Sequence, residues 1–279
     1  IEWSRIEPEE GQWDQEAIEH YQTYIKELKK LQIEPLLNVW HWTHPVWFEQ
    51  KGGFLDKRNL KYFDRFVKKV AQELTEDLNY IITINEPNIY VTYSYLSGEF
   101  PPQQKSLAKT LRVYWNLTRA HRRAYYILKH HKPSLQIGMA AQLANIQAKR
   151  PHNFFDELAT KWMRYSWNWW FLRRVSKQQD FVGFNYYFTD YYKGFVRKNP
   201  DQEPTDDQEL RERQLPGVQR VNPKAPISDL HWYMEPEGLY PLLLRAWKHY
   251  KKPIIVTENG VADAHDQYRR WWIEETIVA

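Results

Sequence analysis

Two apolar runs rich in β-branched residues, each ending in a glutamate, constrain this chain more than any other feature. The first run covers residues 80–84 and leads through Asn85 to Glu86, and the second covers residues 253–257 and leads to Glu258. Continuous apolar runs of this length are typical of strands covered on both faces, as in parallel sheets between helices. Each glutamate is therefore expected where a buried parallel strand ends.

Segments with a helical spacing of apolar residues alternate with such strand-like runs along the chain. Helices are predicted over residues 14–31, with Asp14 as the N-cap, and over residues 59–75, 105–131, 154–174, 235–249 and 266–279. Strands are predicted over residues 1–6, 34–40, 80–84, 134–141, 180–187 and 253–258. This alternation implies an α/β fold with a parallel sheet and right-handed crossovers, closed into a barrel or left open as a doubly wound sheet.

The length of the chain indicates one domain. It has 279 residues, and a (β/α)₈ barrel typically takes about 250. We find no internal repeat and no linker, so a single catalytic domain is predicted over residues 1–279. Residues 193–229 are too polar to build a core and too long for an ordinary connection between a strand and a helix. We interpret them as a polar loop excursion at the active site.

Charge and composition exclude several classes of protein. The 39 basic and 35 acidic residues leave a formal net charge of +4, too balanced for a nucleic-acid-binding surface. The chain has no cysteine, and His41 and His44 have no carboxylate at ligand spacing, so neither a metal nor another cofactor is expected. No run approaches the roughly eighteen apolar residues of a membrane helix, and no signal-peptide pattern is visible. We therefore expect no membrane association and a cytoplasmic location.

Aromatic residues are unusually abundant, with 14 Trp, 19 Tyr and 12 Phe. Flat rings suit carbohydrates, because a pyranose presents axial C–H groups to a ring and hydroxyls around its rim. Most of these rings are nevertheless expected to fill contacts between strands and helices. Two carboxylates at the ends of parallel strands are, in addition, the groups that glycoside hydrolysis requires: one protonates the leaving oxygen while the other attacks or activates water.

An ordered set of motifs resembles the family 1 glycoside hydrolases, the retaining β-glucosidases and β-galactosidases built on a (β/α)₈ TIM barrel. The set consists of Trp-Ser-Arg-Ile at 3–6 with Pro8, His41-Trp42, Gly52-Gly53, Thr-Ile-Asn-Glu-Pro at 83–87, Gly-Phe-Asn-Tyr-Tyr at 183–187 and Thr-Glu-Asn-Gly at 257–260. The shared order makes the resemblance specific, whereas either glutamate motif alone would be weaker evidence. It implies hydrolysis of β-O-glycosidic bonds with retention of configuration through a covalent glycosyl-enzyme.

The resemblance assigns a role to each glutamate. Glu86 would be the general acid and base at the end of the fourth strand, and Glu258 the nucleophile at the end of the seventh. Retention requires the two carboxyl groups about 5 to 5.5 Å apart. Glu258 must be ionised to attack, while Glu86 must hold its proton until the covalent intermediate forms. For each glutamate, the alternative is a carboxylate that caps a helix or pairs with a cation.

The same resemblance assigns five residues to the substrate pocket. His41 would bond a sugar hydroxyl, Trp42 would line the pocket and Asn85 would contact the 2-hydroxyl. Tyr187 would orient the nucleophile through a hydrogen bond, with Asn185 nearby. Packing alone is the alternative for Trp42, and ordinary strand packing is the alternative for Tyr187 and Asn185. For His41 the alternative is a plain core or surface histidine.

The chain departs from the family's pattern at both ends. It starts after the first strand with its sugar-binding Gln and after an Arg early in the second, and it stops before the eighth strand and a Glu-Trp pair that reads the 4- and 6-hydroxyls. An incomplete barrel with about strands two to seven is therefore expected. Because the missing parts largely decide sugar identity, glucosides, galactosides, fucosides and 6-phosphoglycosides stay open as substrates.

Two alternatives to hydrolysis remain open. A transglycosylase would share both carboxylates and favour a sugar acceptor over water, and a non-catalytic remnant or sugar-binding module would bind without turnover. In each case the expected partner is a small β-glycoside or oligosaccharide, and the oligomeric state is not predicted. The 279 residues alone are expected to show negligible activity, because strands two and seven would face a gap with unpaired edges.

Overall fold

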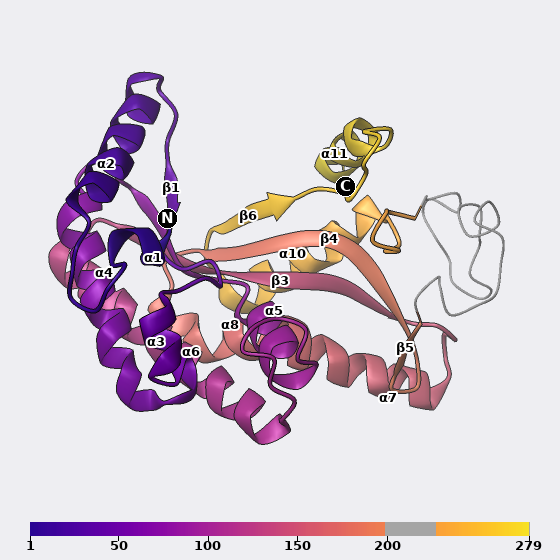
Figure 1. The fold of residues 1–279 in the computed structure, drawn as a ribbon. Coiled ribbons are helices and arrows are strands. Elements are labelled where there is room, and N and C mark those ends of the chain that lie inside the picture. Colours follow the sequence, from indigo (N-terminus) through magenta and orange to yellow (C-terminus); the bar gives the residue numbers. More distant parts are fainter. Residues whose placement is uncertain (199–226, 279) are drawn as a thin grey trace. The chain divides into compact units, whose positions relative to one another are not determined.

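Six strands form one hydrogen-bonded sheet in the computed structural model, which describes residues 1–198 and 227–278 (Figure 1). The strand order is β1-β2-β3-β4-β5, and β6 also pairs with β4. The pairings of β1 with β2 and of β2 with β3 are parallel, whereas β5 returns antiparallel along the end of β4. The strands are β1 (Leu36–Asn38), β2 (Tyr80–Asn85), β3 (Gln136–Ala148), β4 (Val182–Lys193), β5 (Val196–Lys198) and β6 (Ile254–Asn259).

Helices alternate with these strands along the chain, as predicted. They are α1 (Trp3–Ile6), α2 (Gln15–Lys30), α3 (Val46–Gln50), α4 (Leu60–Leu74), α5 (Pro87–Val91), α6 (Leu107–His131), α7 (Phe154–Met163), α8 (Trp170–Val175), α10 (Leu239–Tyr250) and α11 (Arg269–Val278). A π-helical stretch, Arg164–Trp169, joins α7 to α8. Among the described residues, no helix is both long and apolar enough to span a bilayer.

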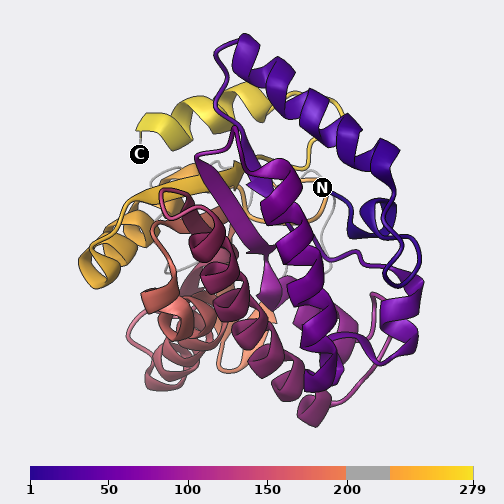
Figure 2. The ribbon, with the colours of Figure 1, turned by 90° about the vertical axis from the view of Figure 1, so that its left-hand side faces the viewer.

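Local sequence explains where the long helices begin and which face they bury. Asp14 caps α2 by accepting a hydrogen bond from the Ala17 backbone N–H at 2.9 Å, as predicted. Ser106 caps α6 in the same way through the Lys109 backbone N–H. On α4 the buried residues follow helical spacing and form one apolar face, and α4 packs side by side with α6 (Figure 2).

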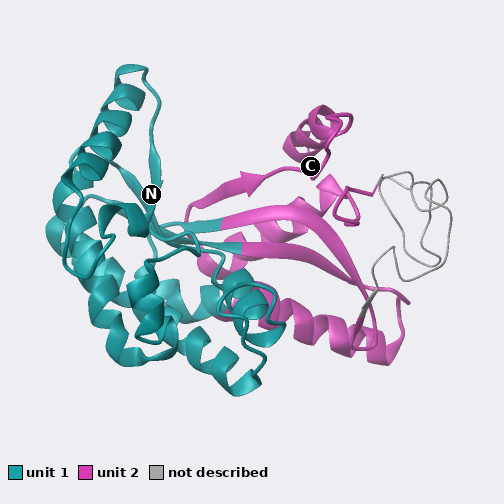
Figure 3. Cartoon of the chain, in the orientation of Figure 1, with its two compact units in different colours: residues 1–141, 171–183 teal, residues 142–170, 184–279 magenta. Residues whose placement is uncertain are grey.

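The described residues fall into two compact units (Figure 3). Unit 1 comprises residues 1–141 and 171–183, and unit 2 comprises residues 142–170 and 184–279. Unit 1 contains β1, β2 and the beginning of β3, and unit 2 contains β6 and most of β4. The prediction of one catalytic domain over residues 1–279 stays a prediction.

The strand predicted over residues 1–6 is wrong, because this segment contains the short helix α1. Trp3 and Ile6, three positions apart, are both buried, which is the spacing of a helical face. The buried carboxylate of Glu7 accepts hydrogen bonds from Trp3 Nε1 and from the Gly11 backbone N–H, both at 2.8 Å. These bonds hold the chain in a tight turn and prevent it from continuing as a strand.

Two strands are longer than predicted. β3 continues to Ala148 and β4 to Lys193, well beyond the apolar runs that predicted them. Of the predicted loop excursion at 193–229, residues 199–226 lie outside the described residues. Its first part contains β5, which extends the sheet by pairing with β4.

Candidate active site

Glu86 follows directly on β2 and precedes α5. Its backbone lies in the left-handed region, with φ 41° and ψ 58°, and its N–H donates to the Ala140 carbonyl at 2.8 Å. Such a conformation costs a residue other than glycine on the order of 1 to 3 kcal/mol and is concentrated at functional sites. The side chain is only 4% exposed and makes no capping hydrogen bond to α5, which argues against the helix-capping alternative.

Three of the predicted pocket residues lie together at this end of β2. Asn85 Nδ2 is 3.0 Å from His41 Nε2, and Trp42 Nε1 donates to the Asn85 carbonyl oxygen at 3.2 Å. Trp42 also has a left-handed backbone, with φ 73°. On the other side of the imidazole, Asn38 Nδ2 is 3.2 Å from His41 Nδ1. The sequence did not predict Asn38, although a polar residue at the end of an apolar strand was a usable signal.

A bulge and a buried histidine support the end of β2. The register between β2 and β3 shifts between Ile82 and Asn85. Such a bulge changes the direction in which the side chains that follow it point. The fully buried His121 lies 2.6 Å from Thr83 Oγ1 through Nδ1 and 2.7 Å from the Gln178 carbonyl oxygen through Nε2. Burial lowers the pKa of His121 to about 4, so the ring is neutral. Because a carbonyl oxygen can only accept, Nε2 donates to Gln178 and Nδ1 accepts from Thr83.

Glu258 lies near the end of β6, and β4 supplies a residue that contacts its side chain. The Tyr187 hydroxyl donates a hydrogen bond to Glu258 Oε2. Next to it, Thr257 Oγ1 donates to Asn185 Oδ1 at 2.5 Å. Both residues that were predicted to accompany the nucleophile therefore bond to β6 side chains at adjacent positions.

The residue after Glu258 is fixed as well. Asn259 Nδ2 donates to the Tyr186 carbonyl oxygen at 3.1 Å, and Trp272 Nε1 donates to Asn259 Oδ1 at 2.9 Å. Trp272, which is fully buried on α11, thereby ties that helix to the end of β6. Such outer hydrogen bonds hold a site residue in one orientation.

The structure therefore gathers the predicted residues into two groups. Unit 1 holds Glu86 with its neighbours His41, Trp42 and Asn85, and unit 2 holds Glu258 with Tyr187 and Asn185. Since the glutamates belong to different units, their predicted separation stays a prediction, as do the individual roles. Within residues 1–198 and 227–278, no cluster of three or more His, Asp or Glu side chains has a metal-binding arrangement.

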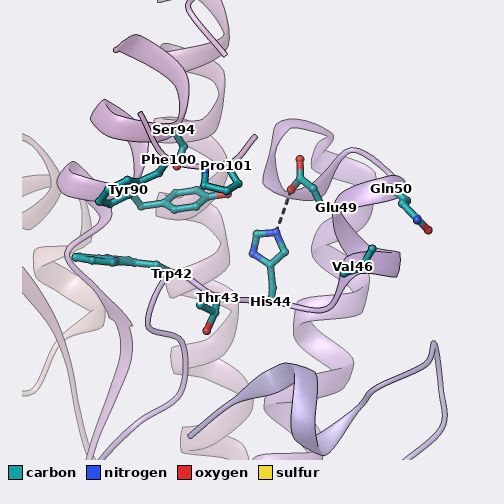
Figure 4. A pocket seen from close by; sticks show the side chains of 10 residues that line it. All are labelled: Trp42, Thr43, His44, Val46, Glu49, Gln50, Tyr90, Ser94, Phe100 and Pro101. Atoms are coloured by element: carbon teal, nitrogen blue, oxygen red, sulfur yellow. Dashed lines mark hydrogen bonds and ion pairs between the residues drawn. The ribbon is translucent and has the colours of Figure 1, made fainter. Parts of the chain in front are cut away.

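A pocket of about 510 Å³ lies beside Trp42 in unit 1 (Figure 4). The rings of Trp42 and Phe100 approach with centroids 5.9 Å apart and give it flat apolar walls. His44 Nε2 and Glu49 Oε2, 3.0 Å apart, supply a polar pair. The lining residues are Trp42, Thr43, His44, Val46, Glu49, Gln50, Tyr90, Ser94, Phe100 and Pro101.

Alternating strands and helices, with a glutamate at the end of each of two strands, are the features that define the barrel glycoside hydrolases. The comparison of the sequence with known families agrees with this class. The model of the family described as "Glycosyl hydrolase family 1" matches residues 1–176 and 171–276, and the chain belongs to this family.

Individual relatives are identical to the chain at about a quarter of the aligned positions. It is 27% identical to a β-galactosidase from Sulfolobus acidocaldarius, over 98% of this chain and 60% of that protein. It is also 27% identical to a 6-phospho-β-galactosidase from Staphylococcus haemolyticus, over 97% of this chain and 67% of that protein. The structure of a β-glycosidase from Pyrococcus horikoshii matches with a TM-score of 0.83 at 28% identity, over 100% of this chain and 65% of that one.

The predicted family and the predicted incomplete (β/α)₈ barrel are thus confirmed. The chain spans 60 to 67% of the length of these three proteins.

Proposed function

We propose that the protein containing this chain hydrolyses β-O-glycosidic bonds with retention of configuration. The observation that carries this proposal is the pair of strand-end glutamates and their surroundings. Glu258 accepts a hydrogen bond from the Tyr187 hydroxyl. The side chain of Glu86 is buried, and its backbone, directly after Asn85, has a left-handed conformation. The matches to glycosidases support hydrolysis over a sugar-binding module.

In the proposed mechanism, Glu258 attacks the anomeric carbon while Glu86 donates its proton to the departing glycosidic oxygen. The product of this step is a covalent glycosyl-enzyme, and the leaving group departs as an alcohol. Glu86, now a carboxylate, takes a proton from water, which attacks the same carbon and releases Glu258. The hydrogen bond from Tyr187 would fix the direction of the attacking carboxylate.

The pocket beside Trp42 supports a site for the leaving group. Its aromatic walls suit a flat apolar ring, and the pair of His44 and Glu49 offers hydrogen bonds to a hydroxyl on it. Burial raises the pKa of Tyr90 well above its ordinary value, so the hydroxyl of this lining residue is neutral. We propose that glycosides with an aromatic leaving group are substrates. The sugar stays open, and the named relatives make β-galactosides and their 6-phosphates the first to test.

Trapping of the covalent intermediate tests the proposal. A dinitrophenyl 2-deoxy-2-fluoro-β-glycoside forms the glycosyl-enzyme and hydrolyses slowly, because fluorine destabilises the oxocarbenium-like transition state. Digestion and mass spectrometry should locate the sugar on Glu258. A label on another residue, or an inverted product by NMR, would contradict the proposed mechanism. Added methanol would separate hydrolysis from transfer, since a transglycosylase should give mainly the methyl glycoside.

A further inference from the structure

Two asparagine side chains contact the two ring nitrogens of His41. Asn38 Nδ2 lies 3.2 Å from Nδ1, and Asn85 Nδ2 lies 3.0 Å from Nε2. A neutral imidazole has one N–H donor and one acceptor nitrogen, so it can accept a hydrogen bond from only one of these amides. The other amide must present its oxygen to the ring N–H.

Burial indicates which asparagine presents its oxygen. Asn38 Oδ1 is buried and has no hydrogen-bond partner among the described residues. No buried side-chain atom of Asn85 lacks a partner. A buried amide oxygen without a partner costs on the order of 1 to 3 kcal/mol. Rotation of the Asn38 amide places this oxygen against the Nδ1–H of His41 and removes the conflict between two donors. Asn85 then keeps its orientation and donates to Nε2.

We propose that Asn38 is a positioning residue that holds His41 as the Nδ1–H tautomer, with Nε2 as the acceptor. Asn38 is the last residue of β1 and stands opposite Ile82 in the parallel register, so it is anchored in a strand. His41 itself is exposed and lies outside a strand, so its ring is held by these two contacts together with the edge-to-face packing of Trp42, whose ring centroid lies 5.1 Å away.

The consequence for binding rests on the function proposed above. If His41 contacts a sugar hydroxyl, Nε2 accepts a hydrogen bond from the hydroxyl O–H, and the hydroxyl takes the place of the Asn85 amide. His41 would then favour a hydroxyl at this position of the sugar over a group, such as a methoxy group, that cannot donate a hydrogen bond. The tautomer itself does not depend on that function, so the two can fail separately.

Nitrogen-15 NMR of the imidazole rings tests the tautomer directly. At about pH 9, well above the ordinary imidazole pKa, the protonated and unprotonated ring nitrogens have widely separated shifts. Signals of His41 are assigned by their loss in His41→Gln. We expect Nδ1 to carry the proton in the unchanged protein. A proton on Nε2 would overturn the proposal.

Two substitutions of Asn38 identify the contacting atom. Asn38→Asp keeps an oxygen acceptor, so the Nδ1–H tautomer should be unchanged. If Asn38 instead contacted the ring through Nδ2, the unchanged protein would hold the Nε2–H tautomer, and Asn38→Asp would convert it to Nδ1–H. Asn38→Ala should give a mixture of both tautomers, and an unchanged single tautomer would contradict the proposal. Asn153→Asp, at the N-cap of α7, is the matched control and should leave the His41 signals unchanged.

Kinetics then measure the effect on the proposed reaction. In the complete protein, Asn38→Ala should lower kcat/KM on the order of tenfold, as loss of a supporting hydrogen bond does at other sites. In a His41→Ala background the same substitution should have almost no effect, because its action passes through His41. An equal loss in both backgrounds would show that Asn38 acts on the fold and would contradict a positioning role.

Discussion

Glu86 and Trp42 both keep a backbone conformation that glycine adopts more readily. In each case the surroundings hold the residue: Glu86 through its N–H to Ala140, and Trp42 through its indole to Asn85. Strain of this kind persists only where packing and hydrogen bonds over-determine it. The strain at Glu86 and Trp42 therefore lowers the folding stability of unit 1, and the surrounding contacts hold both residues in a fixed orientation.

Replacement of Glu258 tests its role as nucleophile. In the complete protein, Glu258→Ala should lower turnover by at least about 10⁴-fold. Added azide should restore part of it, because the anion fits the space left by the side chain and attacks from the same face. The product should be an α-glycosyl azide, identified by NMR. The matched variant Glu86→Ala should give the β-glycosyl azide. A β-azide from Glu258→Ala together with an α-azide from Glu86→Ala would show that Glu86 is the nucleophile and Glu258 the acid.

Replacement of Glu86 separates proton donation from nucleophilic attack. Glu86→Gln should leave dinitrophenyl glycosides able to form the covalent intermediate, because their leaving group needs no protonation. Alkyl glycosides should lose at least about 10²-fold in kcat/KM, the typical contribution of general acid catalysis. Steady-state and burst kinetics on the two classes measure the difference. Equal losses on both classes would count against Glu86 as the acid.

For single residues, the sequence indicated candidates for the site but not the residues that hold those candidates in place. The motifs around Glu86 and Glu258 are local, and the family resemblance extends to residues such as His41 and Tyr187. Asn38 was missed because its contact with His41 depends on how the chain turns after β1. The polar pair in the pocket was missed as well, because His44 suggested only a metal ligand.

At the scale of single elements, periodicity predicted helices more fully than strands. The long helices were recovered within a few residues because their apolar faces and caps are local features, whereas the short helices α1, α3 and α5 were not predicted. The second half of β3 was missed because polar residues interrupt the apolar run. Asn145 there donates to Thr189 Oγ1 at 3.1 Å, and Gln142 Oε1 accepts from the Trp167 indole. These partners are distant in sequence, so the polar residues looked like a loop.

The turn after α1 depends on the carboxylate of Glu7. It accepts hydrogen bonds from Trp3 Nε1 and the Gly11 backbone N–H and pairs with Arg65. Glu7→Ala should lower the free energy of unfolding by about 2 to 3 kcal/mol, because these donors lose a buried partner. Urea titration followed by tryptophan fluorescence measures the change.

Glu10→Ala is the control for this substitution. Glu10 lies on the surface, where its ion pair with Lys51 is screened by solvent. The urea concentration at the midpoint of unfolding of Glu10→Ala should therefore stay close to that of the unchanged protein. Equal shifts for Glu7→Ala and Glu10→Ala would contradict a special role for the buried carboxylate.

For the molecule as a whole, His121 predicts a dependence of stability on pH. Its pKa in the folded state is about 4, below the ordinary 6.5, so the unfolded chain binds more protons between these values. The contribution is complete above about pH 6.5 and is lost as the pH falls toward 4, by up to about 3 kcal/mol. Unfolding titrations at several pH values should show this slope. It should be reduced in His121→Gln and retained in His130→Gln, whose ring is exposed.

The overall architecture was predictable only in part from the residues themselves. Alternation of strands and helices predicted parallel pairing, which β1, β2 and β3 show. It could not distinguish a barrel from an open sheet, because closure depends on strand tilt and register and not on periodicity. The ordered motifs decided between the two, since they link this alternation to one family.

Unit 1 is assembled from two separate stretches of chain, and this affects how it can form during synthesis. Residues 171–183 supply the Gln178 carbonyl that accepts from His121, and Asp180, whose carboxylate accepts from the Ile137 backbone N–H at 2.9 Å. A ribosome releases the chain in order, so these partners emerge about 40 residues after β3 begins. Until then Ile137 and His121 lack them, and the nascent unit is exposed to chaperones and proteases.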